Sequence, residues 1–473
     1  MQGRPIAAIV LAAGLGTRMR SQRAKVLHEV GGRPLLHYPL LALRPLAPSR
    51  VLLVVGHQAE LVRAAAAAVA IPGLETVLQA EQRGTGHAVR CAMEPLAGFE
   101  GDVIVLYGDV PLIRSETLAA LVAAHCREDA ALSLLTLHFA DPTGYGRIVR
   151  DGAGCIRGIV EERDASPAER AITEINPGFY CIRSDVLGPL IERLRPNNAQ
   201  GELYLTDVVG LAAADGRRVT SVAVADADEV AGVNSRAELA WMEGRVKATF
   251  VQRFMDAGVT FEDPATAYLG PDVEIGADTV IGPNVVLRGR TRIGAGCRLE
   301  GTNFLVDTIV GDGTHVLFGT VSDGAEIGAG ARIGPYARLR PGTKLGAAVH
   351  LGNFVETKKA ILGEGTKANH LSYLGDCEIG PDTNVGAGTI TCNYDGFKKS
   401  MTRIGARVQI GSDTQLVAPV TVGDDAYVGA GTTVTRDVPP GALAVSRTPV
   451  RVVEGWTERK RKREGANAKK KGD

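Results

Sequence analysis

A six-residue repeat in the second half of the chain constrains the fold more than any other feature. An Ile, Leu or Val recurs at every sixth position in three runs, and the residue four positions later is usually small or β-branched. The repeated aliphatic positions are Ile275, Ile281, Leu287, Ile293, Leu299, Leu305, Ile327, Ile333, Leu339, Leu345, Leu351, Ile404, Ile410, Leu416, Val422, Val428 and Val434. A hexapeptide cannot bury its own aliphatic side chain, so each unit must stack on the next. The repeat predicts a triangular solenoid of short strands and tight turns, whereas a loop-rich β-sandwich does not require a fixed period.

Length and composition narrow the remaining possibilities. With 473 residues the chain is too long for one ordinary core, so we expect two domains. The 53 basic and 53 acidic side chains balance, which argues against nucleic acid as a partner. The seven cysteines are scattered without CxxC spacing, and no apolar run reaches the length of a membrane span. We therefore expect a soluble, cytoplasmic protein with reduced thiols.

The first half of the chain alternates between strand-like and helix-like segments. The strand-like segments are 6–11, 50–56, 75–79, 103–109, 131–139, 156–162, 178–182 and 219–225. This alternation predicts a parallel sheet with helices on both faces and a ligand site at the carboxyl ends of the strands. From residue 235 to about 257 there are few helix breakers, which predicts a long helix joining the two domains.

The loop after the first strand, LAAGLGTRM, is a candidate phosphate site. Gly14 and Gly16 allow the backbone to approach an anion closely, and Arg18 and Lys25 add positive charge. The loop lacks the third glycine of a dinucleotide fingerprint, because Met19 stands there, and it contains no GxxxxGK[ST] motif. On spacing alone, an ordinary strand-to-helix turn is the alternative.

Further motifs follow this loop along the chain. They are KVLH (25–28), QAEQRGTGHA (79–88), LYGDVPL (106–112), DPTGYGRI (141–148), EINPGFY (174–180) and NNAQGELYLTD (197–207). Together with the hexad region they resemble the bacterial bifunctional N-acetylglucosamine-1-phosphate uridyltransferases and glucosamine-1-phosphate acetyltransferases, over nearly the whole chain. The resemblance implies a Rossmann-like α/β nucleotide-diphospho-sugar transferase domain at 1–234, a linker helix at 235–261 and a left-handed parallel β-helix at 262–449. The basic segment 450–473 is expected to be a disordered tail.

The resemblance also implies roles for residues of the first domain. Lys25 and Arg18 would be catalytic by offsetting the charge of the leaving pyrophosphate, and Asp109 with Asn234 would hold Mg²⁺ through oxygen ligands. Without the resemblance, Asp109 would be interpreted as a turn-capping residue. The other residues expected to bind the nucleotide, its uracil base or the sugar are Leu11, Ala12, Ala13, Gly14, Gln79, Gly84, Thr85, Tyr107, Gly108, Gly146, Glu161 and Asn176.

The implied reaction is in-line attack of a sugar phosphate oxygen on the α-phosphorus of UTP, with release of pyrophosphate. The phosphate nucleophile is already ionised and needs no base, so positioning and charge neutralisation carry the catalysis. One departure from the family's pattern is visible, because Arg23 and Ala24 precede Lys25 where the family commonly has Leu-Pro. This departure leaves open how the loop before Lys25 is held rigid.

The hexad repeat lapses between Leu351 and Ile404, and interruptions of a solenoid are where loops leave it. The segment 386–405 holds the longest insertion, which is suited to reach a neighbouring chain. A lone histidine is more often structural than catalytic, but His370 falls where the resemblance places the acetyltransferase base, and Glu356 is expected to orient its ring. The residues expected to bind the sugar phosphate or acetyl-coenzyme A are Arg340, Lys358, Tyr373, Asn384, Ala387, Asn393, Tyr394, Lys399, Ser412, Ala430 and Arg447.

The resemblance implies a homotrimer in which neighbouring chains build each acetyltransferase site, with no nucleic acid and no membrane span. The substrates would be UTP, acetyl-coenzyme A, glucosamine-1-phosphate and N-acetylglucosamine-1-phosphate, and the cofactor Mg²⁺. A second interpretation keeps the nucleotidyltransferase and treats the solenoid as an inert trimerising or regulatory domain, but His370 and the long insertion argue against it. A third, a scaffold without catalysis, is disfavoured because Arg18, Lys25, Asp109 and His370 occur together.

Overall fold

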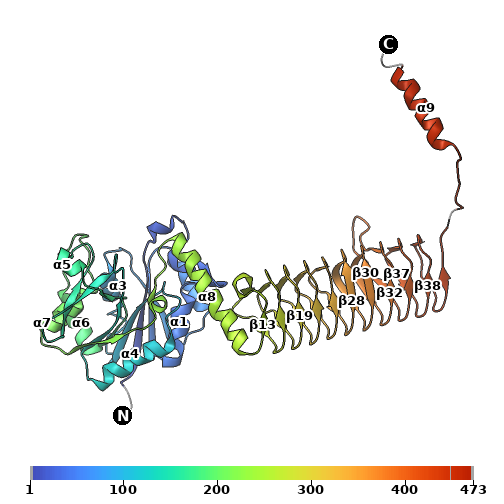
Figure 1. Ribbon diagram of the computed structural model, residues 1–473. Helices are drawn as coiled ribbons and strands as arrows, with labels where there is room; N and C mark the ends of the chain where they lie inside the picture. Colours follow the sequence, from blue (N-terminus) through green and yellow to red (C-terminus); the bar gives the residue numbers. More distant parts are fainter. Residues whose placement is uncertain (1–3, 448, 470–473) are drawn as a thin grey trace. The chain divides into compact units, whose positions relative to one another are not determined.

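The computed structural model describes residues 4–447 and 449–469 (Figure 1). The chain divides into two compact units. The first comprises Met1–Gln252 with Leu269–Pro271, and the second comprises Arg253–Tyr268 with Asp272–Asp473. The division falls inside the long helix α8, Arg236–Asp256, which matches the helix expected from residue 235 and lies mostly in the first unit. Among the residues described, no helix is both long and apolar enough to cross a membrane.

The first unit is built on a ten-stranded mixed sheet. Its strands are β1 (Ile6–Ala12), β4 (Arg50–Val55), β5 (Leu74–Leu78), β6 (Asp102–Tyr107), β7 (Leu132–His138), β8 (Gly146–Arg150), β9 (Ile156–Val160), β10 (Glu174–Asn176), β11 (Tyr180–Arg183) and β12 (Val219–Ala223). They run in the order β5-β4-β1-β6-β11-β7-β10-β8-β9, with β12 beside β7. β1 is parallel to β4 and β6, and β4 to β5, whereas β11, β10 and β8 are antiparallel to their neighbours.

The expectation of an all-parallel sheet is therefore wrong for half of the sheet. Strands β8 and β10 are short and lie outside the segments expected to be strands. The turn between β8 and β9 is too short for the crossover that a parallel pair needs, so these strands form an antiparallel extension. The parallel half still places the carboxyl ends of β1, β4 and β6 next to one another, where the ligand site is expected.

Helices cover both faces of this sheet, as expected. They are α1 (His37–Leu43), α2 (Ala59–Ala67), α3 (Thr85–Cys91), α4 (Ser115–Arg127), α5 (Pro167–Arg170), α6 (Ser184–Arg193) and α7 (Asp207–Ala214), with the 3₁₀ turns η1 (Thr17–Met19), η2 (Lys25–Leu27), η3 (Arg44–Leu46) and η4 (Ala227–Val230) and the hairpin of β2 (Glu29–Val30) and β3 (Arg33–Pro34). Ala7, Ile9 and Leu11 of β1 cluster with α3, α6 and α7, while Ala8 and Val10 cluster with α1, α2 and α4. Alternate side chains of a strand point to opposite faces, so a strand that is apolar throughout needs cover on both.

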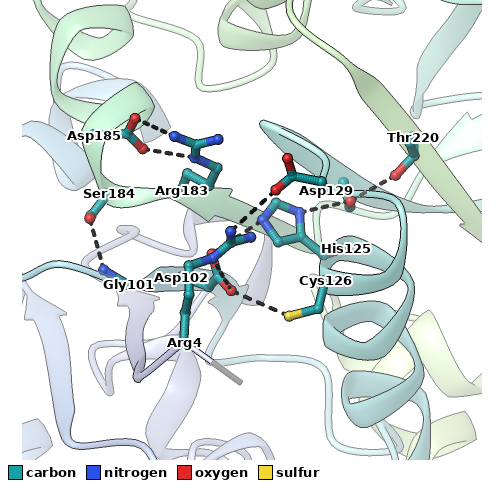
Figure 2. A network of polar contacts seen from close by, with 11 residues as sticks. Arg4, Gly101, Asp102, His125, Cys126, Asp129, Arg183, Ser184, Asp185 and Thr220 are labelled. Carbon is teal, nitrogen blue, oxygen red and sulfur yellow. Dashed lines mark hydrogen bonds and ion pairs between the residues drawn. The ribbon is translucent and has the colours of Figure 1, made fainter. Parts of the chain in front are cut away.

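A buried polar network ties the starts of several strands together (Figure 2). Asp102, at the start of β6, is fully buried and accepts a hydrogen bond of 2.9 Å from Nε of Arg4. Nε2 of His125 on α4 lies 3.3 Å from Asp102 Oδ1, and its Nδ1 lies 2.8 Å from the Ser133 hydroxyl. Ser133 in turn contacts the Thr220 hydroxyl at 2.8 Å. The network joins β6, β7 and β12 at the edge opposite the carboxyl end of β6.

The second unit is a solenoid of short parallel strands. One sheet contains β13 (Thr260–Phe261), β16 (Val280–Ile281), β19 (Arg298–Leu299), β22 (His315–Val316), β25 (Arg332–Ile333), β28 (His350–Asn353), β30 (Lys367–His370), β32 (Asn384–Val385), β35 (Gln409–Ile410), β38 (Tyr427–Val428) and β40 (Leu443–Ala444). The seventeen-stranded sheet contains β14 (Tyr268–Leu269), β15 (Glu274–Ile275), β17 (Val286–Arg288), β18 (Arg292–Ile293), β20 (Phe304–Val306), β21 (Ile309–Val310), β23 (Val321–Asp323), β24 (Glu326–Ile327), β26 (Arg338–Leu339), β27 (Lys344–Leu345), β29 (Glu356–Leu362), β31 (Tyr373–Ile379), β33 (Ile390–Cys392), β34 (Thr402–Ile404), β36 (Gln415–Val417), β37 (Val420–Val422) and β39 (Thr433–Val434). A further 3₁₀ turn, η5 (Pro264–Thr266), precedes β14.

Parallel pairing holds successive coils in register. Val280 pairs with Arg298, and Arg298 pairs with His315, so these coils take 18 and 17 residues. All the aliphatic positions of the repeat are buried, and so are small residues four positions later, such as Thr279 and Ala331. The repeat therefore supplies the core of the solenoid.

The expectation that the coil is interrupted from Leu351 to Ile404 is wrong for most of that segment. Buried side chains continue on each coil at Thr357, Leu362, Ala368, Leu374, Ile379, Val385 and Thr391. The sequence conceals them because threonine or alanine replaces the aliphatic residue on some coils. In addition, two of the spacings, from Thr357 to Leu362 and from Leu374 to Ile379, are five residues instead of six. The chain leaves the coil only after Cys392, where Asn384 pairs with Gln409 and the coil lengthens to 25 residues.

The C-terminal segment differs from the disordered tail expected from its composition. Residues Trp456–Lys469 form helix α9. Its sequence is rich in Lys, Arg, Glu and Ala, which are good helix formers, so a low apolar content does not exclude a local helix. Residues 470–473 of the expected tail lie outside the described residues.

Candidate active sites

A cavity of about 440 Å³ opens where β1, β5 and β6 end. Most residues expected to bind the nucleotide line it, namely Leu11, Ala12, Ala13, Gly14, Lys25, Gln79, Gly84, Thr85, Tyr107 and Asp109. The lining also includes Gln82 and Glu202, two polar residues that the sequence reasoning missed. Gln82 lies in the motif QAEQRGTGHA and Glu202 in the motif NNAQGELYLTD, so both residues could have been predicted from these motifs.

The loop after β1 forms one wall of the cavity. Gly14 has no atom within 4 Å of the position that a Cβ would take, whereas Gly16 has a φ of +61° and a Cβ there would lie 2.7 Å from the Cβ of Lys25. Arg18 is exposed on η1 and is not one of the residues lining the cavity. The N–H of Gly108 donates to the carbonyl of Leu11 at 2.9 Å, which joins the ends of β1 and β6. Of the two glycines in this loop, Gly16 is therefore required by its positive φ and by the closeness of Lys25, whereas Gly14 has room for a side chain.

Three of the expected residues meet at one point of this site. Nζ of Lys25 donates to the Asp109 carboxylate and, at 3.1 Å, to Oδ1 of Asn234. The Lys25 and Asp109 side chains are only 16% and 12% exposed. The N–H of Val233 donates to the Asp109 carbonyl at 3.0 Å, and the N–H of Asn234 donates to Glu238 at 2.6 Å. These bonds fasten the end of β6 to the segment that leads into α8.

The oxygen atoms of Asp109 and Asn234 converge on a single cation, here the Lys25 ammonium. A carboxylate and an amide oxygen are ligands that Mg²⁺ accepts, and Mg²⁺ usually completes its coordination with water and substrate phosphate. Within the described part of the chain, no group of three or more His, Cys, Asp or Glu is arranged to hold a metal. The Asp109 and Asn234 pair therefore fits a divalent metal shared with a phosphate ligand.

The part of the cavity around α3 offers a fixed amide. Gln79 is buried and its Nε2 donates to the carbonyl of Gly84 at 3.1 Å. Gly84 has a φ of +101°, and a Cβ there would lie 2.5 Å from the carbonyl oxygen of Leu203, so the position requires glycine. The Thr85 hydroxyl accepts a hydrogen bond of 3.0 Å from the N–H of Leu205. The contacts of Gly84 and Thr85 fix the backbone to which Gln79 donates, and Nε2 of Gln79 also lies 3.1 Å from Nδ1 of His87, so the Gln79 amide is held in one orientation.

The three residues expected at the sugar lie together on the antiparallel half of the sheet. Gly146 and Asn176 face each other across β8 and β10, and a Cβ on Gly146 would lie 3.4 Å from Oε1 of Glu161. Burial raises the pKa of Glu161, which accepts a hydrogen bond of 3.0 Å from the Thr206 hydroxyl. Burial and the nearby charge of Glu161 raise the pKa of Tyr107. Because Tyr107 also lines the cavity, it links the cavity to the expected sugar residues.

On the second unit, an exposed apolar ladder follows one corner of the solenoid. The ladder consists of Phe318, Tyr336, Phe354 and Leu371 on successive coils, and these side chains are 41, 50, 56 and 64% exposed. The Phe318 and Tyr336 rings meet edge to face with centroids 5.6 Å apart, and the Tyr336 and Phe354 rings stack at 5.7 Å. Exposed apolar surface of this continuity is typical of an interaction surface.

The same corner continues into the expected acetyltransferase residues. Backbone hydrogen bonds link each coil to the next there, through the carbonyl groups of His370 at 3.4 Å, Ala387 at 2.7 Å and Ser412 at 2.8 Å. Ala430 lies on the coil after Ser412, because the Ser412 carbonyl accepts from the residue that follows Ala430. Four expected residues, scattered over sixty positions of sequence, are therefore aligned along one edge.

The His370 ring contacts a different residue from the one expected. Its side chain is exposed at the end of β30, and Nδ1 lies 3.3 Å from Oδ1 of Asn353. Glu356 instead accepts a hydrogen bond of 2.7 Å from Arg340, so the expected contact between Glu356 and His370 is wrong for this chain. Strand register is the cause, because Asn353 is paired with His370 while Glu356 is paired with Tyr373.

The insertion after β33 brings further expected residues to the solenoid. Lys399 lies beside Lys358 on β29, and the hydrogen bond and like charge of Lys399 lower the pKa of Lys358. Asn393 is buried and its amide donates to the Asp376 carboxylate, whereas Tyr394 is 59% exposed. Two adjacent cations are an arrangement that a bound anion would stabilise.

Two further expected residues, Asn384 and Arg447, lie near this region, and so does Cys392. Asn384 is half-buried on β32, next to the corner. Arg447 is exposed beyond β40. Burial raises the pKa of the Cys392 thiol, which disfavours the thiolate and a role as nucleophile.

Two family models match the two units. The MobA-like NTP transferase domain matches residues 8–160, and the bacterial transferase hexapeptide (six repeats) matches residues 401–436. The bifunctional protein GlmU of Pelobacter propionicus is 50% identical over 458 residues, which cover 97% of this chain and 99% of that protein. The GlmU of Anaeromyxobacter sp. (strain Fw109-5) is 53% identical over 465 residues, which cover 98% and 94%.

The chain belongs to the GlmU family. GlmU proteins are bifunctional, and this chain has both parts, an NTP transferase unit that acts as the uridyltransferase and a hexapeptide unit that acts as the acetyltransferase. The hexapeptide match and the parallel coils are consistent with a left-handed β-helix. The interpretation of the solenoid as an inert domain is thereby excluded.

Proposed function

We propose that this enzyme makes UDP-N-acetylglucosamine in two steps, each at one of the sites described above. Acetyl-coenzyme A acetylates the amine of glucosamine-1-phosphate on the solenoid, and UTP then uridylates N-acetylglucosamine-1-phosphate in the first unit. The alignment of His370, Ala387, Ser412 and Ala430 on one edge is the observation that carries the first step. The cavity that Lys25 lines together with Asp109 supports the second step.

For acetyl transfer, His370 acts as general base. Its imidazole takes a proton from the ammonium of glucosamine-1-phosphate, and the free amine attacks the thioester carbonyl to form the amide and release coenzyme A. The Ser412 hydroxyl or the backbone N–H near Ala387 stabilises the oxyanion that forms during attack. Lys358 and Lys399 bind the sugar phosphate, because two neighbouring cations repel each other until an anion lies between them. The remaining contacts that we propose for this site are Arg340, Tyr373, Asn384, Asn393, Tyr394 and Arg447.

For uridyl transfer, the chain supplies positioning and positive charge. The loop at Gly14 holds the triphosphate, and Lys25 and Arg18 offset the charge on the leaving pyrophosphate. The carbonyl oxygen of Gln79 accepts from the imide N–H of uracil, because its amide nitrogen is already engaged with Gly84. A divalent cation, which we propose is Mg²⁺, would be held by Asp109 and Asn234 and would neutralise phosphate charge when bound.

The two activities provide the test, since each serves as the folding control for the other. His370→Ala should lower acetyl transfer by about 10² to 10⁴-fold and leave uridyl transfer nearly unchanged. Lys25→Ala or Asp109→Ala should do the reverse, measured with pre-acetylated sugar phosphate and UTP with and without Mg²⁺. An acetyl transfer rate of His370→Ala within a few fold of the wild type would contradict the assignment.

We also propose that the active form is a homotrimer, with the apolar ladder Phe318, Tyr336, Phe354 and Leu371 packed against a neighbouring copy. The ladder runs directly into the coil that carries His370, so a copy packed there would lie next to that side chain. Phe354→Ser should dissociate the trimer in sedimentation and lower acetyl transfer, and Tyr427→Ser, an exposed aromatic outside the ladder, should do neither. A monomeric wild type with full acetyl transfer would refute the shared site.

We further propose that the protein works in the cytoplasm. All seven cysteines are free in the structure, which suits a reducing compartment. Fractionation of cells that express the protein tests this assignment.

A further inference from the structure

One glutamine side chain holds the segment that leads into Lys25. The N–H of Ala24 donates to Oε1 of Gln58 at 2.8 Å, and Nε2 of Gln58 donates to the carbonyl of Gln22 at 2.8 Å. Nε2 of His57 lies 3.2 Å from the same carbonyl. A single amide group therefore binds both ends of the stretch 22–24, which comes immediately before the turn η2.

The backbone of Gln58 is in an unusual conformation for this contact. Gln58 has φ of 54° and ψ of 40°, in the left-handed region, and it precedes the first turn of α2 without capping it through its side chain. A residue other than glycine adopts the left-handed conformation at a cost in free energy. It is therefore found there where contacts with the surrounding structure hold it in place. At Gln58 the contacts that its side chain makes are the two hydrogen bonds to 22–24.

The segment 22–24, which Gln58 binds, leads directly into Lys25 of the uridyltransferase site. Ala24 is buried, with φ of −55°, and is the N-cap residue of η2. Lys25 follows it, and its Nζ reaches Asp109 and Asn234. The Ser21 hydroxyl also accepts a hydrogen bond of 3.1 Å from the N–H of Arg23, within the segment itself. The ion pair between Arg23 and Glu29, at 3.1 Å, is half exposed on both sides and contributes little rigidity.

We infer, on the basis of the proposed role of Lys25, that Gln58 is a positioning residue for uridyl transfer. Its amide fixes the backbone at Gln22 and Ala24 and so fixes the direction in which the Lys25 side chain leaves the turn. The hydrogen bond to Gln58 requires a backbone N–H at position 24, which Ala24 has and a proline would lack. Gln58 therefore explains how the loop before Lys25 is held rigid in this chain, where Arg23 and Ala24 replace the Leu-Pro that is common in the family.

The test compares uridyl and acetyl transfer in the full-length protein. Gln58→Ala should lower kcat for uridyl transfer by about 10 to 100-fold with a smaller change in KM for UTP, because a group displaced by about 1 Å loses this much of its catalytic effect. Acetyl transfer by the same preparation should be unchanged, since its residues lie in the other unit. Glu60→Ala is the matched control, because Glu60 lies in the first turn of α2, two residues after Gln58, is exposed and pairs with Arg63.

A second variant tests whether rigidity at position 24 is what Gln58 provides. Proline fixes φ near −65°, close to the −55° of Ala24, but removes the N–H that donates to Gln58. Ala24→Pro combined with Gln58→Ala should therefore recover most of the kcat that Gln58→Ala loses. This recovery distinguishes positioning from a general loss of stability, which a second substitution at a buried residue would deepen.

The results distinguish a failure of the positioning role of Gln58 from a failure of the proposed catalytic role of Lys25. If Gln58→Ala keeps kcat within about threefold of the wild type, or if the double variant recovers nothing, the positioning role is wrong. A parallel loss of acetyl transfer would also overturn it, because the defect would then be one of folding. If Lys25→Ala itself leaves uridyl transfer intact, the proposed function of Lys25 fails, whatever Gln58 does.

Discussion

The two glycines of the loop after β1 should respond differently to the same substitution. In Gly16→Ala the new methyl would lie 2.7 Å from the Cβ of Lys25, a distance that non-bonded carbon atoms do not tolerate, and the alanine would keep a φ of +61°. The backbone conformation alone costs about 1 to 2 kcal/mol. The overlap is with a Cβ and not with the end of a flexible side chain, so relief requires a shift of the backbone at Lys25 by several tenths of an ångström.

Such a shift moves the ammonium that bridges Asp109 and Asn234. We expect uridyl transfer by Gly16→Ala to fall by about 10 to 100-fold in kcat, since misplacement of a positioned group by about 1 Å costs about 10²-fold. The melting temperature of the first unit should fall by about 2 to 8 °C, as expected for about 1 to 2 kcal/mol in a domain of this size. Acetyl transfer should not change, because its residues lie in the other unit.

Gly14→Ala is the matched comparison in the same loop. Its Cβ would have no atom within 4 Å, so the protein should keep its melting temperature. In the proposed site the methyl would face the nucleotide phosphates, so KM for UTP should rise while Lys25 stays in place. Steady-state kinetics with pre-acetylated sugar phosphate and calorimetry measure both variants. The reasoning would be refuted if Gly16→Ala were as stable and as active as the wild type, or if the two variants behaved alike.

The other predictions concern buried and orienting polar groups. Burial raises the pKa of Asp102, but the hydrogen bond and charge of His125 and a nearby arginine outweigh it, and the net pKa is lowered. The carboxylate thus stabilises the fold above the unfolded pKa of about 4, and this stability is lost as pH falls through the lower folded pKa. Asp102→Asn should therefore lower the free energy of unfolding near pH 7 by about 1.5 to 3 kcal/mol, and much less near pH 2, in urea titrations. Asn353→Ala should lower kcat for acetyl transfer by up to about tenfold through the lost contact with His370 and leave uridyl transfer unchanged, which the paired assays measure. Glu161→Gln should raise KM for the sugar phosphate about tenfold with little change in KM for UTP, because a charged acceptor is replaced by a neutral one.

Prediction from sequence succeeded best where burial is periodic. The aliphatic positions of the hexad repeat are all buried, because each one faces the axis of its own coil whatever the rest of the chain does. It failed at Thr357, Ala368 and Thr391, which also face inward but carry no aliphatic side chain. A threonine can lie inside the coil because its hydroxyl finds a backbone partner there, as Thr391 does at the carbonyl of Gly375 at 2.9 Å.

Contacts between distant residues were beyond the reach of pattern reasoning. Glu356 was expected beside His370, but the register of β28 with β30 brings Asn353 there instead. The spacing of these residues in the sequence does not reveal how β28 and β30 pair. A shift of the pairing by one residue would bring different side chains opposite each other. The polar residues Gln82 and Glu202 were missed as cavity residues for the same reason, since they meet only after β5, α3 and the segment before α7 have packed.

The sequence by itself determined the solenoid, the α/β unit with helices on both faces, and the residues that form the family's motifs. These properties depend on local periodicity and on residue types, which can be read along the chain. Only the tertiary structure decided that the sheet is mixed, that Lys25 reaches both Asp109 and Asn234, and that Gln58 holds the segment before Lys25. Each of these depends on the register and packing of segments far apart in sequence, and a hydrogen bond forms only when that packing brings its two atoms to within about 3 Å.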